Sequence, residues 1–320
     1  MPHYQPPDAM VSPRIGGLRT FMRLPHVTDM EGVDFAAVGI PFDTGGTYRV
    51  GARFGPQAIR AGSTLLRPFN SVLGVNIFEQ LSGVDYGDVP VVPGAIESSY
   101  ERIEEGLQPI IDAGVIPIGL GGDHSITLAE LRALSRRYGP LGMIQVDAHP
   151  DTWDGYWGVQ YNHGTVFRRA VEEGVLDPSR VIQIGMRGPI YGVEDYDQSR
   201  KMGMELIDME EVRRIGLPSV VARAVERVGT GPTFLSFDID SLDPAFAPGT
   251  GTPEVGGFTT YEALQLVRGL IGVDFVGGDL VEVIPAYDHA EITALAAANV
   301  LFEFVSVLAA NRRDRLVATS

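Results

Sequence analysis

Short apolar runs alternate with longer segments of helical periodicity along most of the chain, and this alternation limits the possible folds more than any other feature. The apolar runs have strand length and lie at 34–40, 115–120, 142–146, 181–186, 233–237 and 275–283. Segments of helix length lie between them, at 100–114, 126–139 and 260–272. Parallel strands need a crossover connection, usually a helix, so this order is typical of a parallel sheet covered by helices on both faces. The sequence therefore predicts an α/β fold.

The chain carries no sign of division into separate units. Its 320 residues contain no Gly/Ser-rich linker, no low-complexity tract and no repeat of fixed period, so we expect one domain over 1–320. Residues 1–30 are rich in proline and are expected to form an arm over the domain itself or over a neighbour. Segment 292–311 approaches the length of a membrane span, but Asn299, Glu303 and Asn311 interrupt it. We predict a long core helix there and no membrane partner.

Charge and cysteine content exclude several classes of function. The formal net charge of −16 and the pI near 4.7 argue against a nucleic-acid partner and mildly favour cationic ligands. The chain has no cysteine, so any metal must be held by His, Asp and Glu. The N-terminus shows no basic stretch followed by an apolar one, so we expect no secretion signal and a cytoplasmic location.

Polar residues gather where three of the predicted strands end. They alternate along the chain and so share a face, and the carboxyl ends of parallel strands meet at one edge of the sheet. Without a cation, burial of bare carboxylates there would cost on the order of several kcal/mol. Two His and four Asp suit two divalent ions bridged by carboxylates. The six candidate ligands are His124, Asp147, His149, Asp151, Asp238 and Asp240.

Other polar residues near these strand ends have alternative interpretations. Asp123 precedes a helical segment and is expected to be its N-cap rather than a ligand, and Asp243 before Pro244 is expected to be a turn residue. Glu282 lies inside the apolar run LVEVIP, so its partner is either a substrate cation or an internal arginine. His163 is either a proton donor to a leaving amine or a plain loop histidine.

Several of these stretches together resemble a known family. The motifs are GGDHS, DAHPD, NHGTVFRR, SFDIDSLDPAFAPGTGTPEVGG and LVEVIPAYDHAEITALAAA, together with the loop at 39–60. In this order they resemble the signatures of the ureohydrolase family, the group of arginase and agmatinase. The resemblance implies the arginase fold, which is a three-layer α/β/α sandwich with a mainly parallel sheet, and assembly as a homotrimer or homohexamer.

The resemblance also implies a role for each metal ligand. His124 and Asp151 would bind one manganese only, and His149 and Asp240 the other only. Asp147 and Asp238 would bridge both ions. His and Asp ligands would accept Ni²⁺ or Co²⁺ as well as Mn²⁺.

The same resemblance implies hydrolysis of a small guanidino substrate to urea and an amine. Water activated between the two metals would attack the guanidinium carbon. Asp151 would orient that water, Glu282 would hold the guanidinium, and His163 would shuttle a proton. Two metals suit this chemistry because a guanidinium resists attack by water at neutral pH.

The substrate tail is a narrower question. The stretches APGTGTPE and PAYDHAEITALAAA resemble agmatinases and guanidino-acid hydrolases more than arginases, and 167–188 is similar to guanidinobutyrases and guanidinopropionases as well as agmatinases, so the tail is either an amine or a carboxylate. Aromatic residues in the metal loop are expected to line a pocket or to pack a subunit interface; these are Trp153, Tyr156, Trp157 and Tyr161. Possible partners for a charged tail are Asp154 and Asp195 for an amine and Arg49 and Arg187 for a carboxylate.

Agmatine is the first choice because an acidic protein favours a dication. Alternatives are 4-guanidinobutyrate, 3-guanidinopropionate, free guanidine and, more distantly, formiminoglutamate. A one-zinc deacetylase with a related fold is disfavoured by the six-ligand set. A silent subunit is disfavoured by the filled ligand positions, and a mixed oligomer with a related chain stays open.

Overall fold

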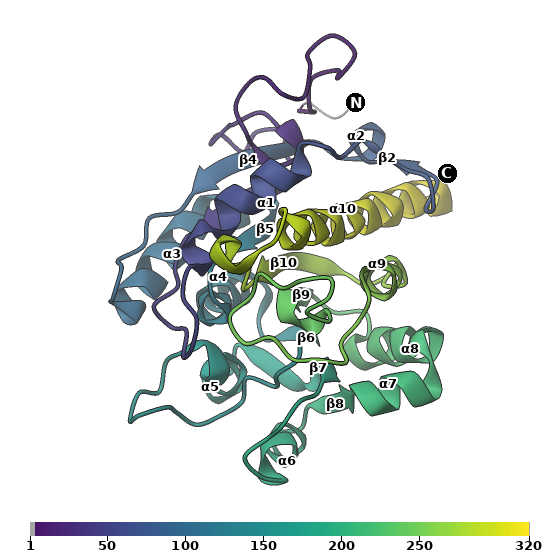
Figure 1. The fold of residues 1–320 in the computed structure, drawn as a ribbon. Coiled ribbons are helices and arrows are strands. Elements are labelled where there is room, and N and C mark those ends of the chain that lie inside the picture. Colours follow the sequence, from purple (N-terminus) through teal and green to yellow (C-terminus); the bar gives the residue numbers. More distant parts are fainter. Residues whose placement is uncertain (1–3, 320) are drawn as a thin grey trace.

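The central feature of the fold is one parallel sheet, seen edge-on between layers of helices in Figure 1. The computed structural model describes residues 4–319, so residues 1–3 of the predicted arm lie outside the described residues. The strands run in the order β4-β1-β5-β10-β9-β6-β7-β8, and the pairs between them are parallel. Their bounds are β1 Phe35–Ile40, β4 Gly83–Asp88, β5 Ile116–Gly121, β6 Leu141–Val146, β7 Leu176–Met186, β8 Glu205–Asp208, β9 Thr233–Asp238 and β10 Phe275–Val281. The predicted α/β class and parallel sheet are confirmed.

Each of the six predicted strands coincides with a strand of this sheet, but the two edge strands were not predicted. β4 and β8 are only partly buried and contain polar residues, because one side of an edge strand meets solvent or loops. Their sequences therefore lack the long apolar run that identifies a central parallel strand. A two-stranded antiparallel hairpin, β2 Phe69–Asn70 with β3 Val75–Asn76, lies outside the sheet.

Helices cover both faces of the sheet and bury its two sets of side chains (Figure 1). One layer contains α1 Gly55–Ser63, α8 Leu217–Val228, α9 Thr260–Arg268 and α10 Ile292–Thr319. The other contains α3 Ile96–Asp112, α4 Thr127–Tyr138 and α5 Val166–Glu172. The shorter helices are α2 Ile77–Gln80, α6 Glu194–Lys201 and α7 Met209–Ile215, with 3₁₀ turns η1 Phe21–Arg23, η2 Ala52–Phe54, η3 His124–Ile126, η4 His163–Thr165, η5 Ile239–Ser241 and η6 Pro285–Tyr287. The result is a three-layer α/β/α arrangement.

The long C-terminal helix α10 packs along the sheet as a core helix. By length and hydropathy it is a candidate membrane span over Ile292–Val317, yet 78% of its most apolar window is buried inside the protein. Glu303 is tolerated in this helix because Arg268 and the side-chain amide of Asn70 both hydrogen-bond to its carboxylate. Asn311 likewise accepts from the backbone N–H of Gly272.

The N-terminal arm lies against the protein's own edge strand β4. Tyr4 accepts a hydrogen bond from the backbone of Gly83, and the N–H of Phe21 donates to the carboxylate of Asp85. Phe21 and Met22 are buried, whereas Met10, Ile15 and Leu18 are exposed. The arm is thus held at Tyr4 and at Phe21, and it exposes apolar side chains between these two residues.

The strand order explains why the predicted site residues meet. β5, β10, β9 and β6 are consecutive neighbours at the centre of the sheet, and all four run in the same direction. His124 follows β5, Glu282 follows β10, Asp238 ends β9 and Asp147 follows β6. Their carboxyl ends therefore deliver these side chains to one short stretch of the sheet edge.

Candidate metal centre and active site

The loop after β6 turns sharply and brings its polar side chains back over the sheet edge. Asp147 fixes the start of this loop, because its carboxylate accepts the backbone N–H of His149 at 2.7 Å. Asp151 has a left-handed backbone with φ of 50°. Such a conformation costs a non-glycine residue roughly 1–2 kcal/mol, so the surrounding structure must hold Asp151 in place.

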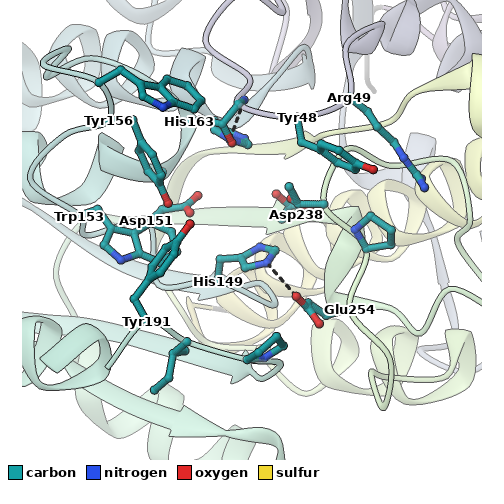
Figure 2. A pocket seen from close by; sticks show the side chains of 17 residues that line it. Tyr48, Arg49, His149, Asp151, Trp153, Tyr156, His163, Tyr191, Asp238 and Glu254 are labelled. Atoms are coloured by element: carbon teal, nitrogen blue, oxygen red, sulfur yellow. Dashed lines mark hydrogen bonds and ion pairs between the residues drawn. The ribbon is translucent and has the colours of Figure 1, made fainter. Parts of the chain in front are cut away.

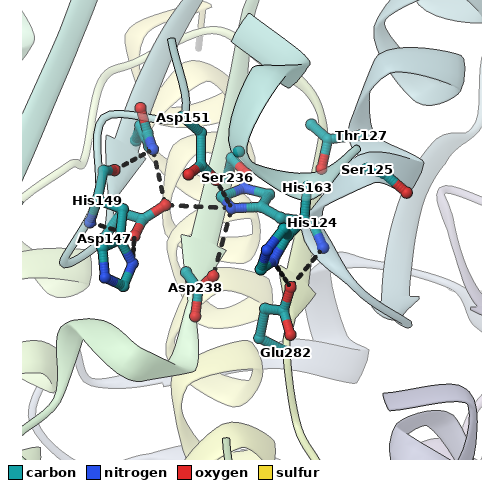
Figure 3. Close-up of polar contacts among 12 residues, drawn as sticks. His124, Ser125, Thr127, Asp147, His149, Asp151, His163, Ser236, Asp238 and Glu282 are labelled. Atoms are coloured by element: carbon teal, nitrogen blue, oxygen red, sulfur yellow. Dashed lines mark hydrogen bonds and ion pairs between the residues drawn. The ribbon is translucent and has the colours of Figure 1, made fainter. Parts of the chain in front are cut away.

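Figure 3 shows the predicted ligands His124, Asp147, His149, Asp151 and Asp238 close together, and the sixth, Asp240, contacts His149. The Nδ1 atom of His124 is 2.9 Å from Asp151 Oδ2 and 3.1 Å from Asp147 Oδ2. The Nδ1 atom of His149 is 3.1 Å from Asp240 Oδ2. These contacts form two groups that could each hold a cation, and the groups share Asp147. Asp238 Oδ2 lies 3.3 Å from His124 Nδ1 and so borders the first group.

The hydrogen bonds of His124 leave one ring nitrogen directed at these carboxylates. Its Nε2 is 2.9 Å from Ser236 Oγ, and that hydroxyl in turn donates to Asp279 at 2.9 Å. This chain favours a proton on Nε2. Nδ1 is buried and makes no hydrogen bond to any residue between 4 and 319. A bare nitrogen facing carboxylate oxygens is the arrangement that a bound cation satisfies.

Electrostatics at the cluster point to the same need for positive charge. Burial raises the pKa of Asp238 well above its usual range, and the charges of Asp240 and Asp147 add to this effect. Burial and the charge of Asp147 raise the pKa of Asp151 to about 6. Burial opposes protonation of His124, but the surrounding carboxylates outweigh it and raise its pKa well above normal. Two dications would balance the four carboxylates and relieve this repulsion.

Glu282 joins the cluster to His163. Its backbone is also left-handed, with φ of 65°, and its N–H donates to Gly122 O at 2.8 Å. The side chain is 3% exposed, and its Oε1 accepts the backbone N–H of His124 at 2.9 Å and faces His163 Nδ1 at 3.0 Å. No arginine forms an ion pair with Glu282 among the described residues. The alternative of an internal arginine partner is therefore wrong.

The surroundings of His163 favour its protonated form. Burial lowers its pKa, but the hydrogen bond and charge of Glu282 and the charges of Asp151 and Asp123 outweigh burial and raise the pKa to about 9. Bound divalent cations would oppose this effect by repelling the imidazolium. Asp123 is the N-cap of η3, as predicted, and accepts the N–H of Ser125.

Comparison with known proteins identifies the family. The model of the family described as "Arginase family" matches residues 33–306. The chain belongs to the arginase family. Enzymes of this family use a binuclear metal centre, and the two cation-binding groups described above fit that requirement. This arginase-family chain is accordingly a hydrolase that acts on guanidino compounds.

Relatives of this arginase-family chain differ in the substrates that their names give. It is 48% identical to a guanidinopropionase and 46% identical to a guanidinobutyrase, both from Pseudomonas aeruginosa, over 96% and 95% of this chain and 96% and 97% of theirs. It is 47% identical to a mitochondrial agmatinase of Gallus gallus, over 95% of this chain and 89% of the relative. Among solved structures, proclavaminate amidinohydrolase from Streptomyces clavuligerus superimposes with a TM-score of 0.90 at 39% identity, covering 94% of this chain and 100% of that one. The predicted arginase fold is confirmed.

A cavity of about 690 Å³ opens above the metal cluster and is the candidate substrate pocket (Figure 2). Trp153, Tyr156 and Trp157 line it, which is one of the two positions that the sequence left open for these rings. The rings of Trp153 and Tyr156 meet edge to face with centroids 5.6 Å apart, so they form a continuous wall. Tyr161 lies elsewhere, packed edge to face against Tyr100.

Three of the residues proposed for the substrate tail do not line this pocket. Asp154 is 70% exposed and pairs with Arg168 and Arg169. Arg187 instead donates to backbone carbonyl oxygens, including those of Asp240 and Glu254. Asp195 accepts the backbone N–H of Tyr191. The structure therefore does not bring Asp154, Arg187 or Asp195 to the substrate.

Sequence reasoning did not single out several side chains that line the pocket. These residues are Thr47, Tyr48, Tyr191, Thr252 and Glu254. Thr47 and Tyr48 lie in the loop at 39–60, which the sequence identified only as a motif. Tyr191 follows β7, and Glu254 lies in the stretch APGTGTPE. A position after a strand, for Tyr191, and a position inside a motif, for Glu254, were the sequence features that could have indicated the pocket.

Proposed function

We propose that this chain hydrolyses agmatine to putrescine and urea with two manganese ions. The observation that carries the proposal is the position of Glu282, a buried carboxylate beside the metal cluster with no arginine partner among residues 4–319. A substrate guanidinium is a planar cation that a carboxylate binds through parallel hydrogen bonds. When bound, the two metals would lower the pKa of water and offset the charge that develops during attack.

The residues of this chain would orient the reactants and move protons. Glu282 would hold the guanidinium with its carbon above the cluster. Asp151 faces the same space and would accept a hydrogen bond from the attacking water, which fixes the direction of attack. His163 would supply a proton to the departing amine nitrogen, since its Nδ1 already lies against Glu282.

Glu254 supports an amine-tailed substrate. It lines the pocket, and its carboxylate lies 4.0 Å from His149 Nε2 without a closer ion-pair partner in the described chain. A terminal ammonium could bind this carboxylate while the aromatic wall covers the aliphatic chain. The net charge of −16 also favours a dicationic substrate.

Guanidino acids are the second candidate because Arg49 lines the same pocket. Its guanidinium stacks on Tyr287 with 4.6 Å to the ring centroid, and it donates a long hydrogen bond of 3.4 Å to Thr250 O. No carboxylate pairs with it among the residues that the structure describes. A carboxylate tail could therefore bind there, which would suit 4-guanidinobutyrate or 3-guanidinopropionate.

Urea release is the direct test of the proposed function. The manganese-loaded protein is assayed with agmatine, 4-guanidinobutyrate, 3-guanidinopropionate and free guanidine, and with formiminoglutamate scored by formamide. We expect the highest kcat/KM with agmatine, and a selective loss for agmatine in Glu254→Gln. Turnover of a guanidino acid in preference to agmatine, lost selectively in Arg49→Gln, would establish the second candidate instead. Release of formamide from formiminoglutamate, with no urea from any of the guanidino compounds, would reject both candidates.

Metal identity and assembly are further parts of the proposal. His and Asp ligands support manganese and are compatible with nickel or cobalt, so elemental analysis of protein purified without added metal decides between them. We propose a homotrimer or homohexamer, supported by the exposed apolar side chains of the arm such as Met10 and Ile15. Light scattering of the purified protein measures the assembly.

A further inference from the structure

Thr47 makes a double contact with His163 that the chemistry above leaves unexplained. Its hydroxyl oxygen lies 2.7 Å from His163 Nε2, and its backbone N–H donates to the same nitrogen at 3.1 Å. The opposite ring nitrogen, Nδ1, faces Glu282 at 3.0 Å. Both ring nitrogens of His163 are therefore engaged, one on each side.

The backbone N–H of Thr47 determines where the proton of a neutral His163 resides. An amide N–H can only donate, so Nε2 must carry a lone pair when it accepts this bond. The single proton of the neutral ring is then on Nδ1, directed at Glu282 and hence at the guanidinium site. Thr47 thus holds His163 in the tautomer that presents its proton to the substrate.

The hydroxyl of Thr47 can hydrogen-bond to Nε2 of His163 both before and after this nitrogen is protonated. A hydroxyl can donate to a bare nitrogen and can rotate to accept from a protonated one. After Nε2 gains a proton, Oγ1 becomes its acceptor, whereas the amide N–H cannot. Thr47 is part-buried and lines the pocket, so solvent in the pocket can reach this residue.

The loop that carries Thr47 is fastened by hydrogen bonds on both sides of this residue. Gly45, two residues earlier, donates its N–H to Asp123 at 2.7 Å and accepts the N–H of His163 at 3.0 Å. Asp43 binds the N–H of Gly51 at 2.9 Å and closes the other end of the loop. The Thr47 to His163 distance is therefore set by hydrogen bonds on both sides.

We propose that Thr47 is a positioning residue for His163: its N–H fixes the tautomer with the proton on Nδ1, and its hydroxyl passes the proton that recharges Nε2 from pocket solvent. In this step Nδ1 gives its proton to the departing amine nitrogen, Oγ1 gives its own proton to Nε2, and a hydronium ion gives one proton to Oγ1 and becomes water. The amine gains one proton, the imidazole stays neutral and the hydroxyl is unchanged; Nε2 returns its proton through Oγ1 when Nδ1 takes up the next one. The inference rests on the proposed function, because it assigns His163 a proton-transfer role.

The test compares Thr47→Val, Thr47→Ser and Thr44→Val in the metal-loaded protein. Valine removes the hydroxyl and keeps the shape and the backbone N–H, and serine keeps the hydroxyl. Thr44 is a matched control in the same loop, since its exposed hydroxyl accepts from Gly94 and does not contact His163. We expect Thr47→Val to lower kcat about 10- to 10²-fold with little change in KM, Thr47→Ser to restore most of it, and Thr44→Val to match the wild type.

A double-mutant cycle distinguishes action through His163 from a general structural effect. In a His163→Asn background we expect Thr47→Val to have almost no further effect on kcat. A full additional loss, an unchanged kcat in Thr47→Val alone, or equal losses in the Val and Ser variants would each overturn the proposal. Wild-type protein that releases no urea from any guanidino compound would instead reject the proposed function.

A measurement without turnover tests the tautomer directly. In metal-free protein labelled with ¹⁵N, above the pH at which His163 loses its extra proton, we expect Nδ1 protonated and Nε2 bare in the wild type and in Thr47→Val. His163→Asn assigns the signals by their loss. A proton on Nε2 in the neutral ring would contradict the role given to the Thr47 N–H.

Discussion

His163 Nδ1 and Glu282 Oε1 lie 3.0 Å apart, and the same carboxylate oxygen accepts the backbone N–H of His124. One oxygen atom therefore connects the candidate proton donor with the segment that carries a metal ligand. Glu282 has a left-handed backbone, so this position is specified by the packed structure rather than by local preference. Movement of this side chain would disturb the proton donor and the guanidinium site together.

Replacement of Glu282 should separate turnover from metal binding. Glu282→Gln keeps an oxygen that can accept from His124 but removes the charge that would hold a guanidinium. We expect kcat/KM to fall at least about 10²-fold, as for loss of a buried charged partner, with metal content unchanged. Urea assays and elemental analysis measure the two quantities, and Glu210→Gln on the exposed surface of α7 is the control. Loss of the metals would show that Glu282 has a structural role in the cluster.

Replacement of Asp238 should remove metal and activity together. Asp238 borders the first ligand group, 3.3 Å from His124 Nδ1, and is the predicted second bridge. In Asp238→Ala we expect no urea release and less than the wild-type metal content. The wild type should show a higher Tm when manganese is added, because a ligand that binds only the folded state stabilises it. The variant should show little or no such shift, and a wild-type shift in Asp238→Ala would contradict the assignment.

His163 should make the stability of the metal-free protein depend on pH in a defined direction. Its pKa is raised to about 9 in the folded protein, so the folded state binds the proton more tightly than the unfolded state does. This stabilisation is complete below the ordinary pKa of about 6.5 and is lost as the pH rises through about 9. The difference in Tm between wild type and His163→Asn, both treated with chelator, should therefore shrink between pH 6 and pH 10. A difference that grows with pH would show that the sign is wrong.

The sequence predicts the centre of this molecule better than its edges. Central parallel strands such as β5 and β9 are buried on both faces, so their apolar runs and the polar residues after them are visible in the sequence. The convergence of His124, Asp147 and Asp238 follows from that pattern once the strands are parallel. The positions of the edge strands and of the pocket loops depend on residues that are distant in the chain. No local sequence pattern identifies those distant residues.

The substrate-tail residues illustrate this limit. Asp154 directly follows the pocket residue Trp153, yet it lies at the surface and pairs with Arg169. Thr47 is 116 residues from His163 in sequence, and only the folded loop brings the two into contact. The roles of such residues therefore depend on tertiary geometry that spacing alone does not determine.

The sequence offered Arg187 as a possible partner for a substrate carboxylate, but in the structure this arginine has a role in stability. Its guanidinium donates to six backbone carbonyl oxygens at 2.7 to 3.4 Å, contributed by the ends of β7 and η5 and by the pocket wall. One of these is the carbonyl of Asp240, a candidate metal ligand, and another is that of Glu254. Arg187 thus fastens the metal cluster to the pocket wall through backbone contacts.

Arg187→Lys should weaken the fold and the second metal position together. A lysine ammonium has three N–H donors on a flexible stem, so at least three of these carbonyl groups would lose their partner. We expect the unfolding free energy of the metal-free protein to fall by about 2–4 kcal/mol in denaturant titrations. Arg214→Lys, at an exposed arginine with one long contact to Glu211, is the matched control and should change it by less than about 0.5 kcal/mol. Calorimetric manganese titration of Arg187→Lys should also show weaker binding at one of two sites, because Asp240 is no longer held; two unchanged sites would mean that Asp240 keeps its place without this arginine.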